Sequence, residues 1–370
     1  MKQNEMISPS QMAMLLLAFT LGSSIVFIPT PVISAAGNGA WMSIILAAAA
    51  GVPGLLSVLY LHRIFPDKSS IQYLGDVFGR WIGSVFTIII LFVMVLMIAN
   101  ITVGAGVFFT TTMMLDTPLY IFHSLILFVS ALTALAGIEV AARMFSLSLL
   151  IMLATIMIIL VFDLGKYHPT HLLPLFTGGA LPVLHGAILI HGFPYSEIFV
   201  FSLLLFYVRP ARNEPLGRML ISAYAVNMII FLAVVLCASM IFGQAAGQRN
   251  FALYEMARVL EIPGFAVRIE AISGITLIAG SYIKSTIALI ALSSGIARIL
   301  KLKDSRSVIL PLTLLLLFMS LTMFSTQMES RISWSVIVPA VNVLATTPIV
   351  LGAVITLIKR SFGKNGKSKA

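Results

Sequence analysis

The sequence predicts an all-α integral membrane protein with ten transmembrane helices in two halves of five, in which the first and sixth helices are broken. Of its 370 residues, 59% are hydrophobic and 10% charged, and the mean hydropathy is +1.06. Soluble domains carry about 25% charged residues. The apolar residues form long continuous runs, whereas a membrane β-barrel shows alternating segments. Glycine-containing breaks interrupt two of these runs near their midpoints.

Apolar runs of about 20 residues or more, enough to cross a bilayer, recur along the chain. They lie near 11–36, 40–62, 80–108, 118–137, 139–163, 179–208, 217–243, 266–299, 307–325 and 332–358. Segments 69–78 and 250–261 place apolar residues at helical spacing among polar ones, which predicts short amphipathic helices. We expect a single transmembrane domain over 1–370, with inverted repeats at about 10–163 and 177–358.

Lysine and arginine are distributed unevenly between the predicted loops. With the N-terminus inside, about 17 of the 23 Lys and Arg residues fall on the inner side and about 5 on the outer side. Both termini are therefore predicted to be cytoplasmic, with 359–370 as a basic tail. A solvated flank is the main interpretation of this tail, and a contact with lipid or a partner is the alternative. Topology accounts for the net charge of +10, so we expect no nucleic-acid partner.

The two breaks occupy corresponding positions in the two halves. Span 1 reads AFTLGSSIVFIPTP around Gly22, Ser23 and Ser24, and span 6 reads AILIHGFPYSEIFVFSLLLF around Gly192. Five spans per half place the halves in opposite orientation, and paired broken helices then indicate a transporter-type central site. The freed N–H groups suit a carboxylate, and the freed carbonyls suit an ammonium or a metal cation. A small amino acid carries both charges, so we expect it to bind at the membrane midplane.

The predicted ligand-binding residues lie at the breaks or are polar groups within spans: Gly22, Ser23, Ser24, Asn100, His191, Gly192, Phe193, Tyr195 and Glu197. A carboxylate in hydrocarbon is costly, so Glu197 is an ammonium partner, a proton acceptor or one half of a structural ion pair. His191 contacts the ligand, carries protons, or is satisfied by a backbone carbonyl. Asn100 lines the site or joins helices by hydrogen bonds.

Lys284 is the only cation predicted to lie deep within a span. Small residues recur at every seventh position beside it: Gly274, Ser281, Ala288 and Gly295. Such a stripe predicts close packing against another helix. We expect Lys284, with Ser281, to take the place of a bound sodium ion and to point at the break in span 1. The alternative is a salt bridge to Glu197, or carbonyl contacts, without a role in transport.

Sequence motifs of enzymes and metal sites are missing. Cys237 is the single cysteine, which excludes a disulfide framework and any multi-cysteine metal site. The chain contains no H-E-x-x-H motif, no phosphate-binding glycine loop and no G-x-S-x-G elbow. We therefore expect a protein that is not an enzyme, holds no metal and needs no cofactor.

Three segments carry a family resemblance: ISPSQMAMLLLAFTLGSSIVFIPTPVISAAGNGAWMS, RIFPDKSSIQYLGDVFGRWIG, and NFALYEMARVLEIPGFAVRIEAI with Arg268 and Glu270. They resemble the B-subunit family of bacterial spore germinant receptors, as do the length and the ten-span layout. That family belongs to the amino acid–polyamine–organocation transporter superfamily, so the resemblance implies a LeuT-like 5+5 inverted repeat. It also implies nutrient sensing, often of an amino acid, in the spore inner membrane. The implied partners are an A subunit and a lipoprotein C subunit.

Two functions remain open from the sequence. The first is a receptor subunit that binds a germinant nutrient and triggers germination. The second is a proton-coupled amino acid permease. The predicted pocket chemistry serves both functions, and the resemblance favours the receptor.

Overall fold

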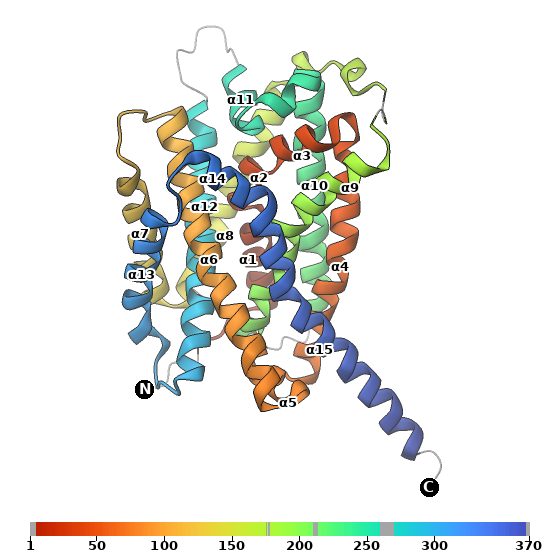
Figure 1. Ribbon diagram of the computed structural model, residues 1–370, viewed down its shortest axis with the longest axis vertical. Coiled ribbons are helices and arrows are strands. Elements are labelled where there is room, and N and C mark those ends of the chain that lie inside the picture. The colour runs from red at the N-terminus through yellow and green to blue at the C-terminus, as the bar shows by residue number, and fades with distance from the viewer. Residues whose placement is uncertain (1–4, 175, 177, 210–213, 260–269, 368–370) are drawn as a thin grey trace.

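The computed structural model describes residues 5–174, 176, 178–209, 214–259 and 270–367. Within these residues, ten helical stretches are long and apolar enough to cross a membrane. They are Pro9–Phe27, Pro29–Ile64, Arg80–Thr112, Leu119–Ala136, Ile138–Phe162, Ala180–Leu203, Leu216–Phe242, Ser273–Ile299, Ser305–Thr322 and Ser333–Ser361. The predicted class, an all-helical membrane protein with ten spans, is confirmed (Figure 1).

Each half of the chain contributes five spans. The first half holds α1 (Pro9–Leu21) with α2 (Ser24–Phe27), then α4 (Ala40–Ile64), α6 (Arg80–Thr112), α7 (Leu119–Ala136) and α8 (Ile138–Phe162). The second half holds α9 (Ala180–Gly192) with η4 (Tyr195–Leu203), then α10 (Leu216–Phe242), α12 (Glu270–Ile299), α13 (Ile309–Thr322) and α15 (Val338–Lys367).

Short helices connect the spans or form their first turns. They are α3 (Pro29–Ala36), η1 (Gly37–Gly39), α5 (Ser70–Phe78), η2 (Leu164–Lys166), η3 (Pro169–Leu172), η5 (Leu205–Tyr207), η6 (Gly243–Gln248), α11 (Ala252–Val259), η7 (Ser305–Val308), α14 (Gln327–Ile332) and η8 (Ser333–Ile337). The two amphipathic helices expected from the sequence are present as α5 and α11. The end of the second predicted segment and Arg268 lie outside the described residues.

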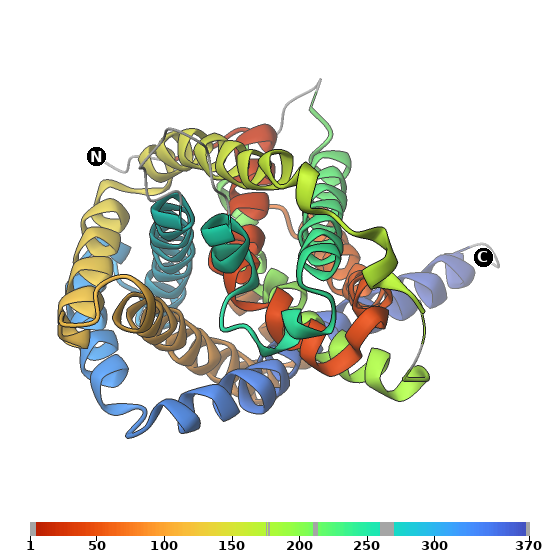
Figure 2. The same cartoon turned by 90° about the horizontal axis from the view of Figure 1, so that it is seen from above.

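The two broken spans form the centre of the bundle. In an apolar 18-residue window of each span, 78% of the first span's residues and 89% of the sixth's are buried, against 22% in the ninth, and the eighth matches the first at 78%. Seen from above, the red first span lies within a ring of later helices (Figure 2). It packs against α8, α10 and α12, with Met12, Ala18 and Phe19 fully buried. Positions this deep suit a ligand site that is shielded from lipid on all sides.

The first span starts as expected but ends earlier than the predicted limit of 36. Ser8 and Gln11 form a capping box at its start, with Pro9 in the first turn. After the break, α2 ends at Phe27 and a separate helix, α3, begins at Pro29 and packs against α9 and η6. Proline has no N–H to continue the ladder of hydrogen bonds, so Pro29 starts a new helix better than it extends an old one.

Candidate functional site

The break in span 1 lies where Gly22 and Gly280 meet. Gly22 donates to the Ala18 carbonyl at 2.9 Å and ends α1 with a non-helical ψ of −127°. A Cβ on Gly280 of α12 would lie 2.5 Å from the Gly22 oxygen and 2.4 Å from its carbonyl carbon. Real side chains do not tolerate such distances, so two glycines allow the backbones to touch. The predicted break in span 1 is confirmed.

The break in span 6 is held by α15. Helix α9 ends at Gly192, whose carbonyl accepts a hydrogen bond from Asn342 Nδ2 at 2.9 Å. Beyond it, the Thr346 hydroxyl donates to the Ser196 carbonyl at 2.6 Å. The second half of this span, η4, is a 3₁₀-helix and not the expected α-helix. The predicted break is therefore confirmed, and part of its freed backbone bonds to protein side chains.

A buried ion pair joins the two breaks to α12. Lys284 Nζ lies 2.5 Å from Glu197 Oε2, one turn beyond the span 6 break, and neither side chain is exposed. The same ammonium donates to Ser24 Oγ, in the span 1 break, at 2.9 Å. Three segments that are distant in sequence thus meet at one ammonium group. Lys284 thus contacts the span 1 break and also forms the salt bridge to Glu197, and its role in place of a sodium ion stays a prediction.

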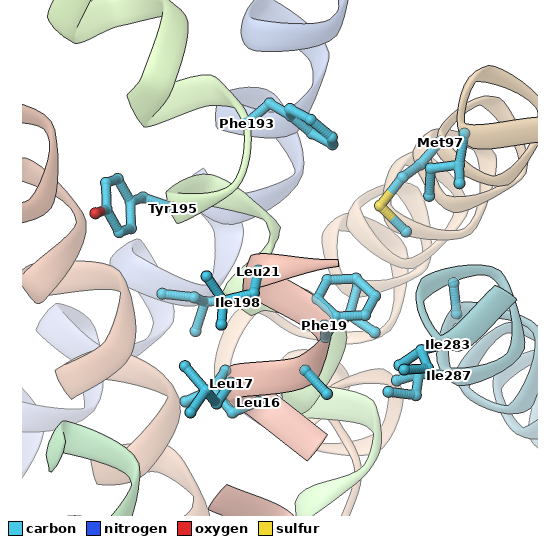
Figure 3. Packing of buried hydrophobic residues seen from close by; sticks show 14 of the residues in the cluster. Leu16, Leu17, Phe19, Leu21, Met97, Phe193, Tyr195, Ile198, Ile283 and Ile287 are labelled. Atoms are coloured by element: carbon cyan, nitrogen blue, oxygen red, sulfur yellow. The ribbon is translucent and has the colours of Figure 1, made fainter. Parts of the chain in front are cut away.

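Aromatic rings cover the ammonium on two sides. Lys284 Nζ lies 3.6 Å from the centre of the Phe193 ring and 5.2 Å from that of Phe19. Both distances suit cation–π attraction, which is stronger away from water. Phe193 and Tyr195 point in opposite directions from the span 6 break, and Phe19 projects from α1 below it (Figure 3). The rings therefore stabilise the positive charge of Lys284 and leave its contacts with Glu197 and Ser24 intact.

Four buried hydroxyls that are close in sequence to Ser24, Glu197 or Lys284 lack hydrogen bonds in the described part of the chain. They are Ser23 Oγ, Ser196 Oγ, Ser281 Oγ and Ser285 Oγ. Each is next to, or one helical turn from, Ser24, Glu197 or Lys284 in the sequence. Buried polar groups are nearly always hydrogen-bonded in native proteins. These buried donors and acceptors are therefore available to a small polar ligand.

Two of the predicted site residues bond to backbone carbonyls, and the ring of a third packs against another tyrosine. Asn100 donates to the Leu96 carbonyl at 2.9 Å. His191 Nδ1 lies 3.4 Å from the Ala47 carbonyl oxygen, as in the alternative in which a backbone group satisfies it. The Tyr195 ring packs against Tyr224, with ring centroids 5.1 Å apart, while its buried hydroxyl has no hydrogen-bond partner in the described part of the chain.

Sequence reasoning missed three residues that shape the site. Asn342 and Thr346 of α15 hold the span 6 break, and Phe19 covers Lys284. The first two are polar residues at i and i+4 in a largely apolar span. That spacing places them on one helix face, which is a signal that could have found them. No comparable signal distinguishes Phe19 from the other apolar residues of α1.

The fold and the site define a class: membrane proteins built as a LeuT-type inverted repeat, with a polar centre at two broken helices. A sequence model of one family, described as spore germination protein, matches residues 6–328. This chain belongs to that family. It is 26% identical over 321 residues to spore germination protein KB of Bacillus subtilis (strain 168), a match covering 85% of this chain and 84% of that protein.

Solved structures of transporters share the fold. A Na⁺-coupled sialic acid symporter, substrate-bound and outward-open, has a TM-score of 0.69 at 14% identity, covering 94% of this chain and 79% of its own. MhsT in complex with L-phenylalanine has a TM-score of 0.68 at 14% identity, and the match covers 95% of this chain and 88% of the MhsT chain. Mhp1, a nucleobase-cation-symport-1 family transporter in a closed conformation, has a TM-score of 0.68 at 12% identity. The match covers 94% of this chain and 78% of the Mhp1 chain.

Proposed function

We propose that this chain is the membrane subunit of a spore germinant receptor, which binds a small nutrient such as an amino acid and triggers germination. The observation that carries the proposal is the buried Lys284–Glu197 pair, 2.5 Å long, at the junction of the two breaks. Membership of the spore germination protein family supports the receptor role. The unpartnered hydroxyls of Ser23 and Ser281 support a polar ligand at the same place.

The chemistry proposed for the site is an exchange of partners. A zwitterionic amino acid presents an ammonium to Glu197 and a carboxylate to Lys284, so it replaces the internal pair without leaving a buried charge unpaired. Binding would separate η4 from α12, because each then holds one end of the ligand. A ligand that prefers the separated arrangement shifts the protein toward it, which is the signal passed to a partner.

Substitutions at Glu197 test this proposal in spores that carry the variant as their only nutrient receptor. Glu197→Gln removes a charged hydrogen bond to the ligand, worth about 1.5–3 kcal/mol. We expect the nutrient concentration for half-maximal germination to rise about tenfold or more. Asp116→Asn, at an exposed carboxylate far along the chain, is the matched control. Normal germination by a nutrient-independent trigger checks spore quality, and an unchanged nutrient response would remove Glu197 from the site.

The remaining features of the receptor proposal concern its surroundings. We place the subunit in the spore inner membrane, with an A subunit and a lipoprotein C subunit as partners and both termini in the cytoplasm. The excess of Lys and Arg on one side supports this orientation, and both described ends of the chain lie at the same end of the bundle (Figure 1). Labelling of a cysteine added at the C-terminus by an impermeant reagent in intact cells would contradict the orientation.

A proton-coupled amino acid permease is the second candidate function. The similarity to solved transporters over 94–95% of the chain favours it. Under either function, we propose that Lys284 with Ser281 occupies the place of a sodium ion, because the ammonium lies at the span 1 break. Proteoliposomes containing the purified chain separate the candidates. Uptake of labelled amino acid driven by a proton gradient supports the permease, and binding without uptake supports the receptor. A requirement for sodium would refute the role of Lys284.

A further inference from the structure

A cavity of about 390 Å³ lies far from the charged pair, where α5 crosses the start of α6 beside the end of α12. Its lining includes Ile71, Gly75, Arg80, Gly83, Thr87 and Ile299. Helix α5 lies at the same end of the bundle as both described ends of the chain (Figure 1). The volume is in the range of small-molecule sites, roughly 300–1,000 Å³.

Two glycines allow the helices to cross at the cavity. A Cβ on Gly83 would lie 2.7 Å from the Gly75 Cα and 2.8 Å from the Leu74 carbonyl oxygen. The backbones of α5 and α6 are therefore in direct contact at this point. Such a crossing holds the walls of the cavity in place without any side chain filling it.

The polar groups of the cavity favour an anion. Arg80 is exposed, and its guanidinium has no partner in the described part of the chain. Thr87 also lines the cavity with 4% of its surface exposed, and its hydroxyl makes no hydrogen bond among the described residues. Helix α6 begins after Gly79 without a side-chain cap, so its positive end is open. The nearby carboxylate of Asp76 is neutralised by Lys68 at 2.7 Å.

The surface beside the cavity is apolar and faces outward. On α6, Trp81 is 88% exposed, Ile88 63% and Phe92 59%. Trp81 follows Arg80 directly, and Ile88 and Phe92 lie about two and three helical turns further along the same membrane span. A tryptophan at the start of a span is typical of the membrane interface, where lipid headgroups lie. The cavity therefore opens where a phosphate group and an acyl chain meet.

We propose that this cavity binds an anionic phospholipid, with its phosphate at Arg80 and Thr87 and an acyl chain along Ile88 and Phe92. Arginine binds phosphate oxygens through two parallel N–H groups, which explains an unpaired guanidinium at the mouth. The exposed apolar side chains of Trp81, Ile88 and Phe92 favour a lipid over a free phosphate ion, because a free phosphate has no acyl chain to bury against them. The site is independent of the nutrient receptor proposal, because it uses other residues at another end of the fold.

Binding can be measured on the full chain in detergent by native mass spectrometry, with phosphatidylglycerol and phosphatidylcholine in competition. We expect the wild-type chain to retain phosphatidylglycerol preferentially, and Arg80→Gln to reduce that preference at least threefold. Arg63→Gln is the matched control, since Arg63 is exposed at the end of α4 and does not line the cavity. Thr87→Val gives a second, uncharged perturbation that should also weaken retention. Thermal unfolding of each variant checks that its fold is intact.

Three results would overturn the proposal. One is an equal preference for both lipids in the wild-type chain, and another is an equal loss in Arg80→Gln and Arg63→Gln. The third is displacement of the lipid by millimolar inorganic phosphate, which would assign the site to a free anion. Ser84 also lines the cavity, so a photo-crosslinker attached to Ser84→Cys, in a Cys237→Ser background, distinguishes a lipid from a protein occupant. Labelling of lipid supports the proposal, and labelling of another protein chain would make the cavity a protein interface.

Discussion

At the scale of single residues, the centre of this protein depends on two charges that are costly alone. Lys284 and Glu197 are both fully buried. Removing one partner of a buried pair leaves an unpaired charge and costs about 3–5 kcal/mol, whereas replacing both by apolar groups of similar volume can be nearly neutral. The ring of Phe193 and the hydroxyl of Ser24 stabilise the ammonium further. Each charge is therefore maintained by the presence of the other.

A double-mutant cycle tests this dependence. We expect Lys284→Met and Glu197→Leu each to lower the free energy of unfolding by about 3–5 kcal/mol in detergent. The double variant should lose less than either single variant, because it removes both charges together. Thermal or denaturant unfolding measures all three against the wild-type chain. Additive losses would show that the two side chains do not stabilise each other.

A different buried carboxylate, Asp163, predicts how stability depends on pH. Asp163 follows α8, has no exposed side-chain surface, and its oxygens accept no hydrogen bond in the described part of the chain. Burial raises the pKa of this carboxyl from 3.8 to about 6, although the Lys166 ammonium, 3.8 Å away, opposes the rise. The other titratable groups facing it, Tyr167 and Cys237, are uncharged near neutral pH.

The folded state therefore binds this proton more tightly than the unfolded state does. Between pH 4 and about 6, stability should fall as pH rises, by at most about 3 kcal/mol, and the contribution should level off above that range. Asp163→Asn removes the titrating group, so its unfolding temperature should vary less over the same pH interval. Identical pH profiles for the two chains would contradict the assignment.

At the residue scale, the sequence located the charges but not their partners. Glu197 and Lys284 stand out because ionisable side chains are rare in hydrocarbon. Their mutual contact was one of two alternatives, since a sequence does not give the rotation of α12 about its axis. His191 and Asn100 stand out as polar residues within apolar spans, yet their side chains bond to backbone carbonyls. Hydropathy reports that a polar residue is buried, and packing decides what it contacts.

At the scale of elements, the second half of span 6 is the most unusual part of the fold. The 3₁₀-helix η4 runs over nine residues, from Tyr195 to Leu203, and runs beyond three or four residues are uncommon and often mark a hinge. A 3₁₀-helix rises about 0.5 Å more per residue than an α-helix, so rewinding this segment would shorten it by roughly 4–5 Å. The helix that carries Glu197 can therefore shorten by this amount in a conformational change.

The glycine contact between the span 1 break and α12 is a second element that can be tested. Gly280→Ala places a methyl group 2.4 Å from a backbone atom of Gly22, which cannot move aside as a side chain would. We expect a loss of about 1–3 kcal/mol in unfolding free energy, typical of overpacking, together with a weaker nutrient response. Gly54→Ala is the matched control, because its Cβ would meet only the Thr346 methyl group, at 3.4 Å. Equal stability of the two variants would contradict the close contact.

Sequence patterns predicted most elements and missed those that depend on tertiary contacts. Ten apolar runs and two glycine-containing breaks were sufficient for the spans and for the broken helices. The 3₁₀ form of η4 was not predictable, because an apolar run has the same composition in either helix. The early end of span 1 could have been predicted from the sequence, because Pro29 and Pro31 lie within the predicted apolar run. The prediction nevertheless extended the span to residue 36, because the residues on both sides of these prolines are apolar.

At the scale of the whole molecule, the N-terminal segment joins elements from both halves at one end of the bundle. Glu5 accepts a hydrogen bond from Ile138 N, at the start of α8, at 2.8 Å, and from Arg306 at 2.5 Å. Ile7 pairs with Val208 in a parallel bridge, through bonds of 2.9 Å to the Tyr207 carbonyl and from Arg209 N. The end of span 6 is thus attached to the chain just before span 1.

This attachment predicts that the bundle opens at this end only when Ile7 and Val208 separate. Neighbouring strands lie about 4.8 Å apart, within the range that a disulfide can span. In a Cys237→Ser background, we expect the pair Ile7→Cys and Val208→Cys to cross-link on oxidation. The cross-link should abolish the nutrient response, and a reducing agent should restore it, because rewinding or rocking of span 6 moves Val208 away from Ile7. Either single cysteine variant, oxidised in the same way, is the control. A cross-linked chain that responds normally would show that the end of span 6 stays in place during signalling.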